Sequence, residues 1–189
     1  MSVTVEEGST VLRACQEAGV EVPVFCYHER LSIAGNCRMC LVETKGSHKP
    51  VASCAMPVHE DMEIFTDTPA IQESRKGNLE FLLINHPLDC SICDQSGECD
   101  LQDYSYEYGS DKIRYEEHRR TFVDGDMGPV IKKNMNRCIH CTRCIRFGAE
   151  IAKIPEVVAV QRGNNTEIVT VDDKPLQTEY AGCYADICP

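Results

Sequence analysis

Cysteine is the residue type that offers this chain the most chemistry, with 13 cysteines among 189 residues. That is about 7 % of the chain, several times ordinary usage. Such a content indicates disulfide bonds, zinc sites or iron–sulfur clusters, and the spacing of the cysteines must decide among them. The count is odd and no secretory signal peptide is present, so a disulfide framework is the weakest of the three interpretations.

The clearest spacing belongs to the third donor group, which comprises Cys138, Cys141, Cys144 and Cys188. A C-x2-C-x2-C run with a distant Cys-Pro is typical of [4Fe–4S] ligation, because one loop reaches three iron corners and another segment supplies the fourth. Zinc sites more often use two separated Cys-x2-Cys pairs. Cys183 is a rival for the fourth position, but Pro189 after Cys188 favours Cys188. His140 lies inside the loop and is expected to be a bystander, because the cysteine set is complete.

The first donor group comprises Cys26, Cys37, Cys40 and Cys54. Its spacing, C-x10-C-x2-C-x13-C, follows the order of a plant-type ferredoxin with a longer first loop. It predicts a [2Fe–2S] cluster, with zinc as the alternative. Gly35 and Asn36 suit a loop whose backbone N–H groups point at cluster sulfurs.

The second donor group comprises His86, Cys90, Cys93 and Cys99. A lone histidine is usually a helix-end residue. These three cysteines lack a fourth thiolate, however, because the other groups are complete and the two spare cysteines, Cys15 and Cys183, lie far away in sequence. One histidine and three cysteines could hold a [4Fe–4S] cluster or a zinc ion, so local spacing leaves both open.

Residues 1–68 read as a mixed α/β unit that positions the first donor group. Val3 and Val5 predict a short strand. Thr10 is expected to cap a helix that buries Cys15 and ends at Gly19. Three further strands are predicted at residues 40–44, 50–54 and 63–66.

Residues 69–110 hold the second donor group. Thr68-Pro69 predicts a helix start, and the helix should run to about Asn85, where His86-Pro87 stops it. Residues 88–109 are predicted to be rich in loops. The alternating rings of Tyr104, Tyr106 and Tyr108 are expected to pack.

Residues 111–189 hold the third donor group. Glycine and proline predict turns at 125 and 128–129, a helix is expected at 139–151, and strands are expected at 157–160 and 167–171. The chain is therefore predicted to be α+β, with three small modules at 1–68, 69–110 and 111–189. Each small module would be organised around its own metal site.

Charge and hydropathy exclude several kinds of partner. Thirty acidic against nineteen basic residues give a formal charge of −11, which argues against nucleic acid or anionic lipid. No apolar run approaches the roughly 18 residues that a membrane span needs. The G-x-G-x-x-G fingerprint of a dinucleotide site is also missing.

Three long motifs carry a family resemblance. Residues 25–43 (Phe25-Cys-Tyr-His to Leu-Val-Glu43), 85–103 (Asn85-His-Pro-Leu-Asp-Cys to Leu-Gln-Asp103) and 137–147 (Arg137-Cys-Ile-His-Cys to Arg-Phe147) occur in order, with a late Ile187-Cys-Pro. Together they resemble the large iron–sulfur subunit of respiratory NADH:ubiquinone oxidoreductase, complex I. The resemblance covers nearly the whole chain, and the sequences of the motifs are most similar to those of mitochondrial members.

The resemblance implies a ferredoxin-like β-grasp first module and three clusters. It places one [2Fe–2S] cluster on the first donor group and one [4Fe–4S] cluster on each of the second and third. It also implies an oxidoreductase subunit with no catalytic site of its own, which relays single electrons from a flavin- and NADH-binding partner towards ubiquinone. The implied location is the peripheral arm of complex I, on the matrix side of the mitochondrial inner membrane.

Members of that family usually begin with one more strand before Val3 and continue past the final Cys-Pro into a large domain. We therefore expect a split, truncated or short relative. Two alternatives stay open: a relay subunit of a soluble NAD-linked hydrogenase or diaphorase, and a zinc-bound scaffold. The absence of an additional Cys-rich cluster set favours the mitochondrial type. Basic residues near the sites are expected to favour the reduced, more negative clusters; they are Arg38, Arg137, Arg143 and Arg146.

Overall fold

The first helix, α1 (Val11–Glu17), begins where the sequence predicts. The computed structural model describes every residue from Met1 to Pro189 except His48. Thr10 caps the helix by accepting a hydrogen bond from the Arg13 amide at 3.3 Å. Gly19 follows with φ of +72°, a conformation that glycine adopts without strain. Cys15 is buried as predicted, with its side chain in the apolar cluster beneath the sheet.

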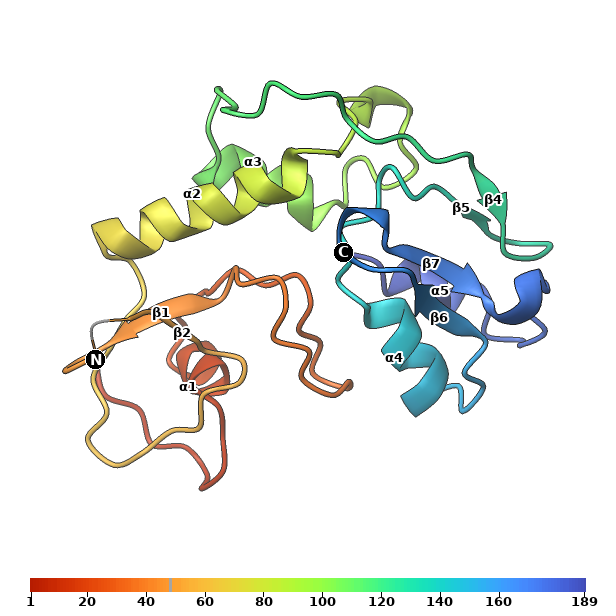
Figure 1. Ribbon diagram of the computed structural model, residues 1–189. Helices are drawn as coiled ribbons and strands as arrows, with labels where there is room; N and C mark the ends of the chain where they lie inside the picture. The colour runs from red at the N-terminus through yellow and green to blue at the C-terminus, as the bar shows by residue number, and fades with distance from the viewer. Residues whose placement is uncertain (48) are drawn as a thin grey trace.

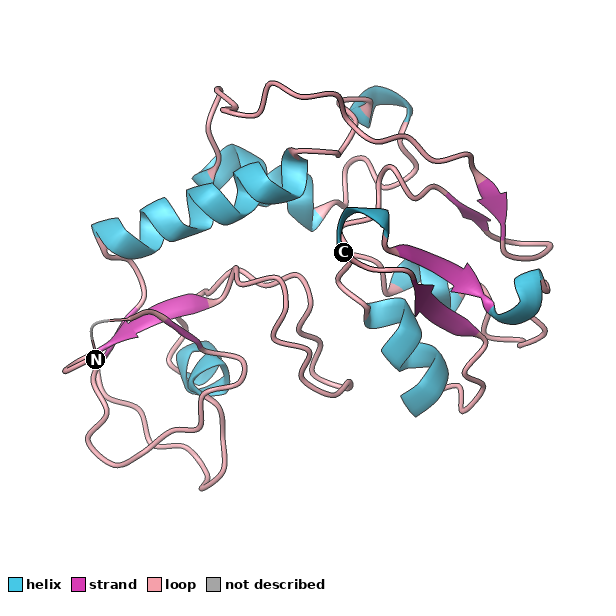
Figure 2. Ribbon diagram, viewed as in Figure 1, coloured by secondary structure: helices cyan, strands magenta, loops and turns pink. Residues whose placement is uncertain are grey.

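The three predicted strands form one antiparallel sheet in the order β2-β1-β3. The central strand β1 (Leu41–Thr44) pairs with β2 (Val51–Ala52) on one side and β3 (Ile64–Phe65) on the other. Val42 is fully buried between this sheet and α1. The predicted α+β class is confirmed, and Figure 2 shows how much of the chain consists of loops between short elements.

The strand predicted at Val3 and Val5 is wrong. Residues 1–6 have no regular structure, and Val3 is 44 % exposed. Alternation alone cannot make a strand, because backbone N–H and C=O groups need a partner strand. The nearest pairing in the described chain is a single antiparallel bridge between Thr10 and Pro57.

Helix α2 (Pro69–Leu83) has the predicted proline start, and its cap Thr68 accepts from the Ile71 amide at 3.2 Å. The prediction of loops over 88–109 is wrong for its second half, which forms α3 (Asp100–Tyr108). Helix α3 packs against α2 in Figure 1 and in the contacts between elements.

The apolar residues of α3 explain why it forms. Leu101, Tyr104 and Tyr108 recur at helical spacing and face a cluster that includes Phe25, whose ring centroid lies 5.3 Å from that of Tyr104. This spacing was available in the sequence, but the alternation of tyrosines obscured it. The packing expected for Tyr106 is wrong, since that residue is 96 % exposed.

The remaining elements belong to the C-terminal part of the chain. They are β4 (Gly125–Asp126), β5 (Lys132–Lys133), α4 (Arg143–Glu150), β6 (Val157–Val160), β7 (Glu167–Thr170) and α5 (Cys183–Asp186). Strands β6 and β7 pair as an antiparallel hairpin, as predicted. The helix predicted at 139–151 begins only at residue 143, because His140 and Thr142 have positive φ angles of 55° and 61°.

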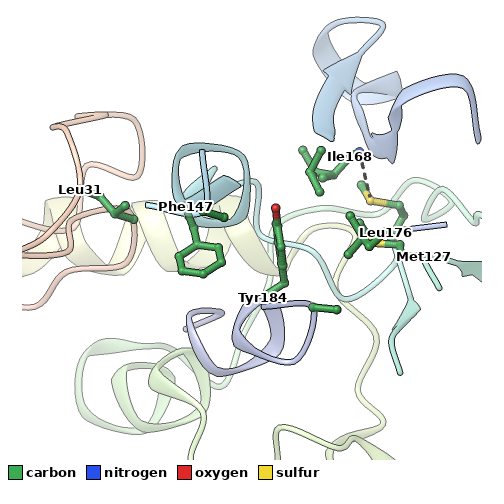
Figure 3. Close-up of a cluster of buried hydrophobic side chains, with 10 residues drawn as sticks. Leu31, Met127, Phe147, Ile168, Leu176 and Tyr184 are labelled. Atoms are coloured by element: carbon green, nitrogen blue, oxygen red, sulfur yellow. Dashed lines mark hydrogen bonds between the residues drawn. The ribbon is translucent and has the colours of Figure 1, made fainter. Parts of the chain in front are cut away.

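Two buried clusters join segments that are far apart in sequence. Phe25 and Met39, from the first cysteine loop, pack with Leu79 of α2 and Leu101 of α3. Leu31 packs in a different cluster, which surrounds Phe147 of α4. Figure 3 shows Leu31 beside Phe147, with Tyr184 on the other side of that ring. The loop of residues 26–36, orange in Figure 1, thus extends from the first sheet towards α4.

Candidate metal centres

All thirteen cysteines are free thiols in the structure. The twelve predicted donors fall into the three expected places along the fold. Across the described residues, no three His, Cys, Asp or Glu side chains converge tightly enough to hold a single metal ion. Two observations therefore show which thiols are neighbours: the hydrogen bonds between them and their effects on one another's pKa.

In the first donor group the four thiols influence one another directly. The Cys37 thiol donates a hydrogen bond to the Cys26 sulfur, which lowers the pKa of Cys26 and raises that of Cys37. Cys54 donates to Cys40 in the same way, lowering the pKa of Cys40. The charge of Cys26 also reaches Cys40 and Cys54, so the structure brings all four predicted residues together.

Sheet pairing explains half of this convergence. Cys40 directly precedes β1 and Cys54 follows β2, so the antiparallel pairing of these strands places the two cysteines side by side. The Ser53 amide donates to the Cys40 carbonyl at 3.1 Å. Cys26, Cys40 and Cys54 are almost fully buried.

The loop carrying Cys37 curls around the sulfur of Cys26. Gly35 and Arg38 have φ angles of +62° and +59°, and the Cys26 amide donates to the Cys37 sulfur at 3.4 Å. The Asn36 amide contributes to lowering the pKa of Cys26. Backbone N–H groups in this loop do face sulfur, as its glycine and asparagine suggested.

The third donor group is gathered from three segments. Cys138 and Cys141 lie on the loop before α4, and Cys144 lies in the first turn of that helix. Burial, together with the neighbouring thiols of Cys141 and Cys138, raises the pKa of Cys144 to about 12. The same causes raise the pKa of the Cys188 thiol to about 12, although the residue as a whole is exposed. Cys188 therefore faces the other three thiols of the group.

The rival Cys183 begins α5 and packs against the hydrophobic cluster that contains Phe147 and Tyr184, as Cys138 and Cys144 also do. His140 is occupied as well, since its Nε2 lies 3.0 Å from the carbonyl oxygen of Thr166. The bystander role of His140 and the choice of Cys188 over Cys183 stay predictions.

The second donor group is more open. His86 follows α2, Cys90 begins a 3-10 turn, Cys93 follows that turn, and Cys99 caps α3. Cys90 is exposed, and Cys93 and Cys99 are partly exposed. The structure therefore gives more support to His86 as a metal donor than to the convergence of all four residues of the second donor group.

The imidazole of His86 has a nitrogen that could bind a metal. Its Nδ1 is buried without a hydrogen-bond partner. Burial lowers the pKa of His86, which keeps the ring in the neutral form that binds metal. A buried nitrogen without a partner is costly unless a ligand satisfies it.

Basic side chains reach the first and third donor groups unevenly. The charge of Arg146 contributes to lowering the pKa of Cys26 and opposes the burial that raises the pKa of Cys141. Arg38 is exposed, and its carbonyl accepts from the Asn78 amide group at 2.6 Å. The sequence predicted the same electrostatic role for Arg38 and Arg146, and the structure shows an influence on the cysteines for Arg146.

Three family models match the chain in series. Residues 1–69 match a 2Fe-2S iron-sulfur cluster binding domain. Residues 75–114 match the NADH-ubiquinone oxidoreductase-G iron-sulfur binding region, and residues 128–189 match the ferredoxin-like domain of NADH-quinone oxidoreductase subunit 3. The three matched ranges contain the first, second and third donor groups respectively.

Curated relatives agree over the full chain. The NADH-ubiquinone oxidoreductase 75 kDa subunit of Reclinomonas americana is 58 % identical over 189 residues, covering 100 % of this chain and 27 % of the relative. The chain belongs to the family of the large iron–sulfur subunit of complex I. NADH dehydrogenase [ubiquinone] iron-sulfur protein 1, mitochondrial, of Solanum tuberosum is 56 % identical, over 99 % of this chain and 25 % of that relative. The mitochondrial NADH-ubiquinone oxidoreductase 78 kDa subunit of Neurospora crassa is 53 % identical, over 99 % and 25 %.

The chain thus spans about a quarter of the length of the complex I relatives that it matches. Among solved structures, a chain of an NAD+-reducing [NiFe]-hydrogenase in the H2-reduced state superposes with a TM-score of 0.78 at 29 % identity. The match covers 90 % of this chain and 71 % of that one. None of the described helices is both long enough and apolar enough to cross a membrane.

Proposed function

We propose that this chain relays single electrons through three iron–sulfur clusters, from a flavin-bearing partner subunit towards quinone. The proposal places a [2Fe–2S] cluster on Cys26, Cys37, Cys40 and Cys54. It places a [4Fe–4S] cluster on His86, Cys90, Cys93 and Cys99, and a second one on Cys138, Cys141, Cys144 and Cys188. Bound clusters would supply one-electron carriers at positions where the chain itself has only thiols and an imidazole.

The observation that supports this proposal most is the adjacency of the first and third donor groups. The charge of Cys26 reaches the thiol of Cys141 and raises its pKa. The Asn36 side chain, next to Cys37, donates to the His140 carbonyl at 3.0 Å. These contacts place the first and third donor groups next to each other, which supports a relay between them.

The second donor group adjoins the third. The Gln95 side chain donates to the carbonyl of Cys188 at 3.3 Å, and the charge of Cys93 reaches Arg137. Contacts therefore link each donor group to the next one, in the order first, third, second, as an electron relay requires.

The donor chemistry fits iron–sulfur clusters. Soft thiolates select such clusters, and the unpartnered Nδ1 of His86 offers the one nitrogen donor. Burial of Cys26, Cys40, Cys54 and Cys141 excludes water from the sulfurs. The chain's contribution is to hold these groups, shield them and set the local charge.

The proposal extends to the surroundings of the chain. We propose module boundaries of 1–68, 69–110 and 111–189. Its partners would be other peripheral-arm subunits of complex I, including the flavin- and NADH-binding subunit. Its location would be the matrix side of the mitochondrial inner membrane, in keeping with its mitochondrial relatives.

A second candidate function is the relay subunit of a soluble NAD-linked hydrogenase, which the superposition on the [NiFe]-hydrogenase chain favours. Purification from the native source separates the two. Co-purification with quinone-reducing membrane subunits supports the complex I assignment. Co-purification with a nickel–iron subunit supports the alternative.

The cluster proposal itself is tested by anaerobic iron, sulfide and zinc analysis with low-temperature EPR of the reduced chain. About ten irons per chain and signals from three clusters are expected. A colourless protein that contains three zinc ions would instead establish a structural scaffold.

A further inference from the structure

One guanidinium contacts both the first and the third donor group. Nη2 of Arg146, on α4, donates to the carbonyl oxygen of Cys26 at 2.5 Å and to that of Cys141 at 3.2 Å. Cys26 belongs to the first group and Cys141 to the third. A single nitrogen atom therefore bridges residues that are 115 positions apart in sequence.

The other two nitrogens of this guanidinium are engaged as well. Nη1 of Arg146 donates to the carbonyl of Ser32 at 2.5 Å, and Nε lies 3.4 Å from the hydroxyl of Thr142. Only a planar fork with several fixed donors can satisfy this arrangement, whereas a lysine ammonium on its flexible stem cannot hold all four oxygens. The side chain is half-buried, so these bonds are partly shielded from water.

The surrounding contacts show that this junction is constructed from several side chains of α4. Glu150, one turn after Arg146, accepts from the Ser32 amide at 2.7 Å and from the Ser32 hydroxyl. Arg143 donates to the carbonyl of Tyr27 at 2.8 Å. Leu31 inserts into the apolar cluster beneath α4 (Figure 3).

A fixed positive charge at this point acts on both sites. Adding an electron makes a cluster more negative, and a nearby cation stabilises that reduced form. The hydrogen bonds of Arg146 go to backbone carbonyls and a hydroxyl, which carry no net charge. Its charge also lowers the pKa of Glu150, one turn further along α4, but no ion pair joins these two side chains in the described chain. The charge of Arg146 therefore still acts on the sites on either side.

We propose that Arg146 is a positioning residue shared by two relay sites, which fixes the loop of Cys26 against that of Cys141 and raises the reduction potentials of both clusters. The inference rests on the proposed function, because it assigns Arg146 a role towards the clusters placed there. It predicts a joint response, in which a change at one side chain on α4 alters a cluster held mainly by another part of the chain.

The experiment compares R146Q and R146K in the assembled complex that contains the full chain, using redox titration followed by EPR. R146Q removes the charge but keeps an amide donor, so the midpoint potentials of the first- and third-group clusters should both fall while the second-group potential stays unchanged. R146K keeps the charge, so both potentials should stay near the wild-type values. R162Q, which alters an exposed arginine on the β6–β7 turn, is the matched control and should shift none.

A shift of only one potential in R146Q, or of neither, with clusters intact, overturns the inference. If R146Q loads neither cluster, R146K decides the matter by hydrogen exchange. Exchange should then rise together over residues 26–36 and 140–142, and a rise on one side alone contradicts a shared role. Loss of all EPR signals from the wild-type chain would instead remove the proposed function, which is a separate result.

Discussion

The side chain of Arg137 donates two hydrogen bonds, at 2.6 and 3.2 Å, to one carboxylate oxygen of Asp89. Each of these residues directly precedes the first cysteine of a donor group, since Asp89 lies before Cys90 and Arg137 before Cys138. The two side chains are 24 % and 31 % exposed. The pair joins the second and third donor groups and balances the charge between them.

Breaking this pair from either side should move the neighbouring potentials in opposite directions. D89N leaves the guanidinium uncompensated, so the potentials of the second- and third-group clusters should rise, by on the order of 30 mV. R137M leaves the carboxylate alone, so the same potentials should fall. Redox titration with EPR measures both. D172N, which breaks the exposed pair of Asp172 with Lys174, should change neither; shifts of the same sign in D89N and R137M would contradict the electrostatic account.

The histidine of the second donor group is expected to set the charge of its cluster. H86C replaces a neutral imidazole with a thiolate, so the cluster becomes one unit more negative and its reduction potential should fall. The measurement is a redox titration of the second-group EPR signal. H140Q is the matched control, because His140 contacts the Thr166 carbonyl instead. An equal or higher potential in H86C, with the cluster intact, would refute the role given to His86.

The two C-terminal cysteines should respond differently to substitution. C188S removes a thiol that faces the rest of the third donor group, so the third-group signal should vanish and iron should fall by about four per chain. C183A alters a residue that packs in the hydrophobic cluster, so iron content should remain unchanged. Iron analysis and EPR on both variants provide the readout, and the reverse pattern would make Cys183 the ligand.

Cluster loading should depend on pH more steeply at the third donor group than at the first. A thiol must lose its proton to bind iron. Burial raises the pKa of all four thiols of the third group. In the first group only Cys37 and Cys54 have a raised pKa, because they donate hydrogen bonds that hold the pKa of Cys26 and Cys40 below the ordinary value. Between pH 7 and pH 9 the third group therefore displaces more protons, and its loading gains more from the added base.

Anaerobic reconstitution of the metal-free chain with iron and sulfide at several pH values tests this difference. The first-group EPR signal should already form near pH 7, and the third-group signal should increase strongly towards pH 9. Parallel pH profiles for the two groups would show that the burial of the third-group thiols does not govern loading.

The insertion of Leu31 should contribute measurably to stability. Leu31 is 7 % exposed and packs in the cluster around Phe147, so L31A should lower the free energy of unfolding by about 2–4 kcal/mol. Ile33, on the same loop, is 46 % exposed, and I33A should cost far less. Urea unfolding of the cluster-loaded chain compares the two. Equal effects would mean that the loop does not depend on its apolar anchor.

Several local elements follow from short-range chemistry and could be predicted from the sequence. Thr10 and Thr68 have hydroxyls that cap helices within three residues, and the strands around Cys40 and Cys54 carry β-branched residues bounded by turns. Helix α3 was missed although its apolar residues have helical spacing, because the alternating tyrosines obscured that pattern. Its packing partners, Phe25 and α2, lie outside the local sequence.

The sequence by itself predicted which residues are metal donors and how they divide into groups, because ligand spacing within one loop is fixed by covalent geometry. Only the tertiary structure decided how the groups face one another. Contacts such as those of Arg146 with Cys26 and Cys141 depend on hydrogen bonds between distant segments, which no local pattern encodes. Residue types near a site can be read from the chain, but whether a given charge reaches one site, two or none is a property of the packed fold.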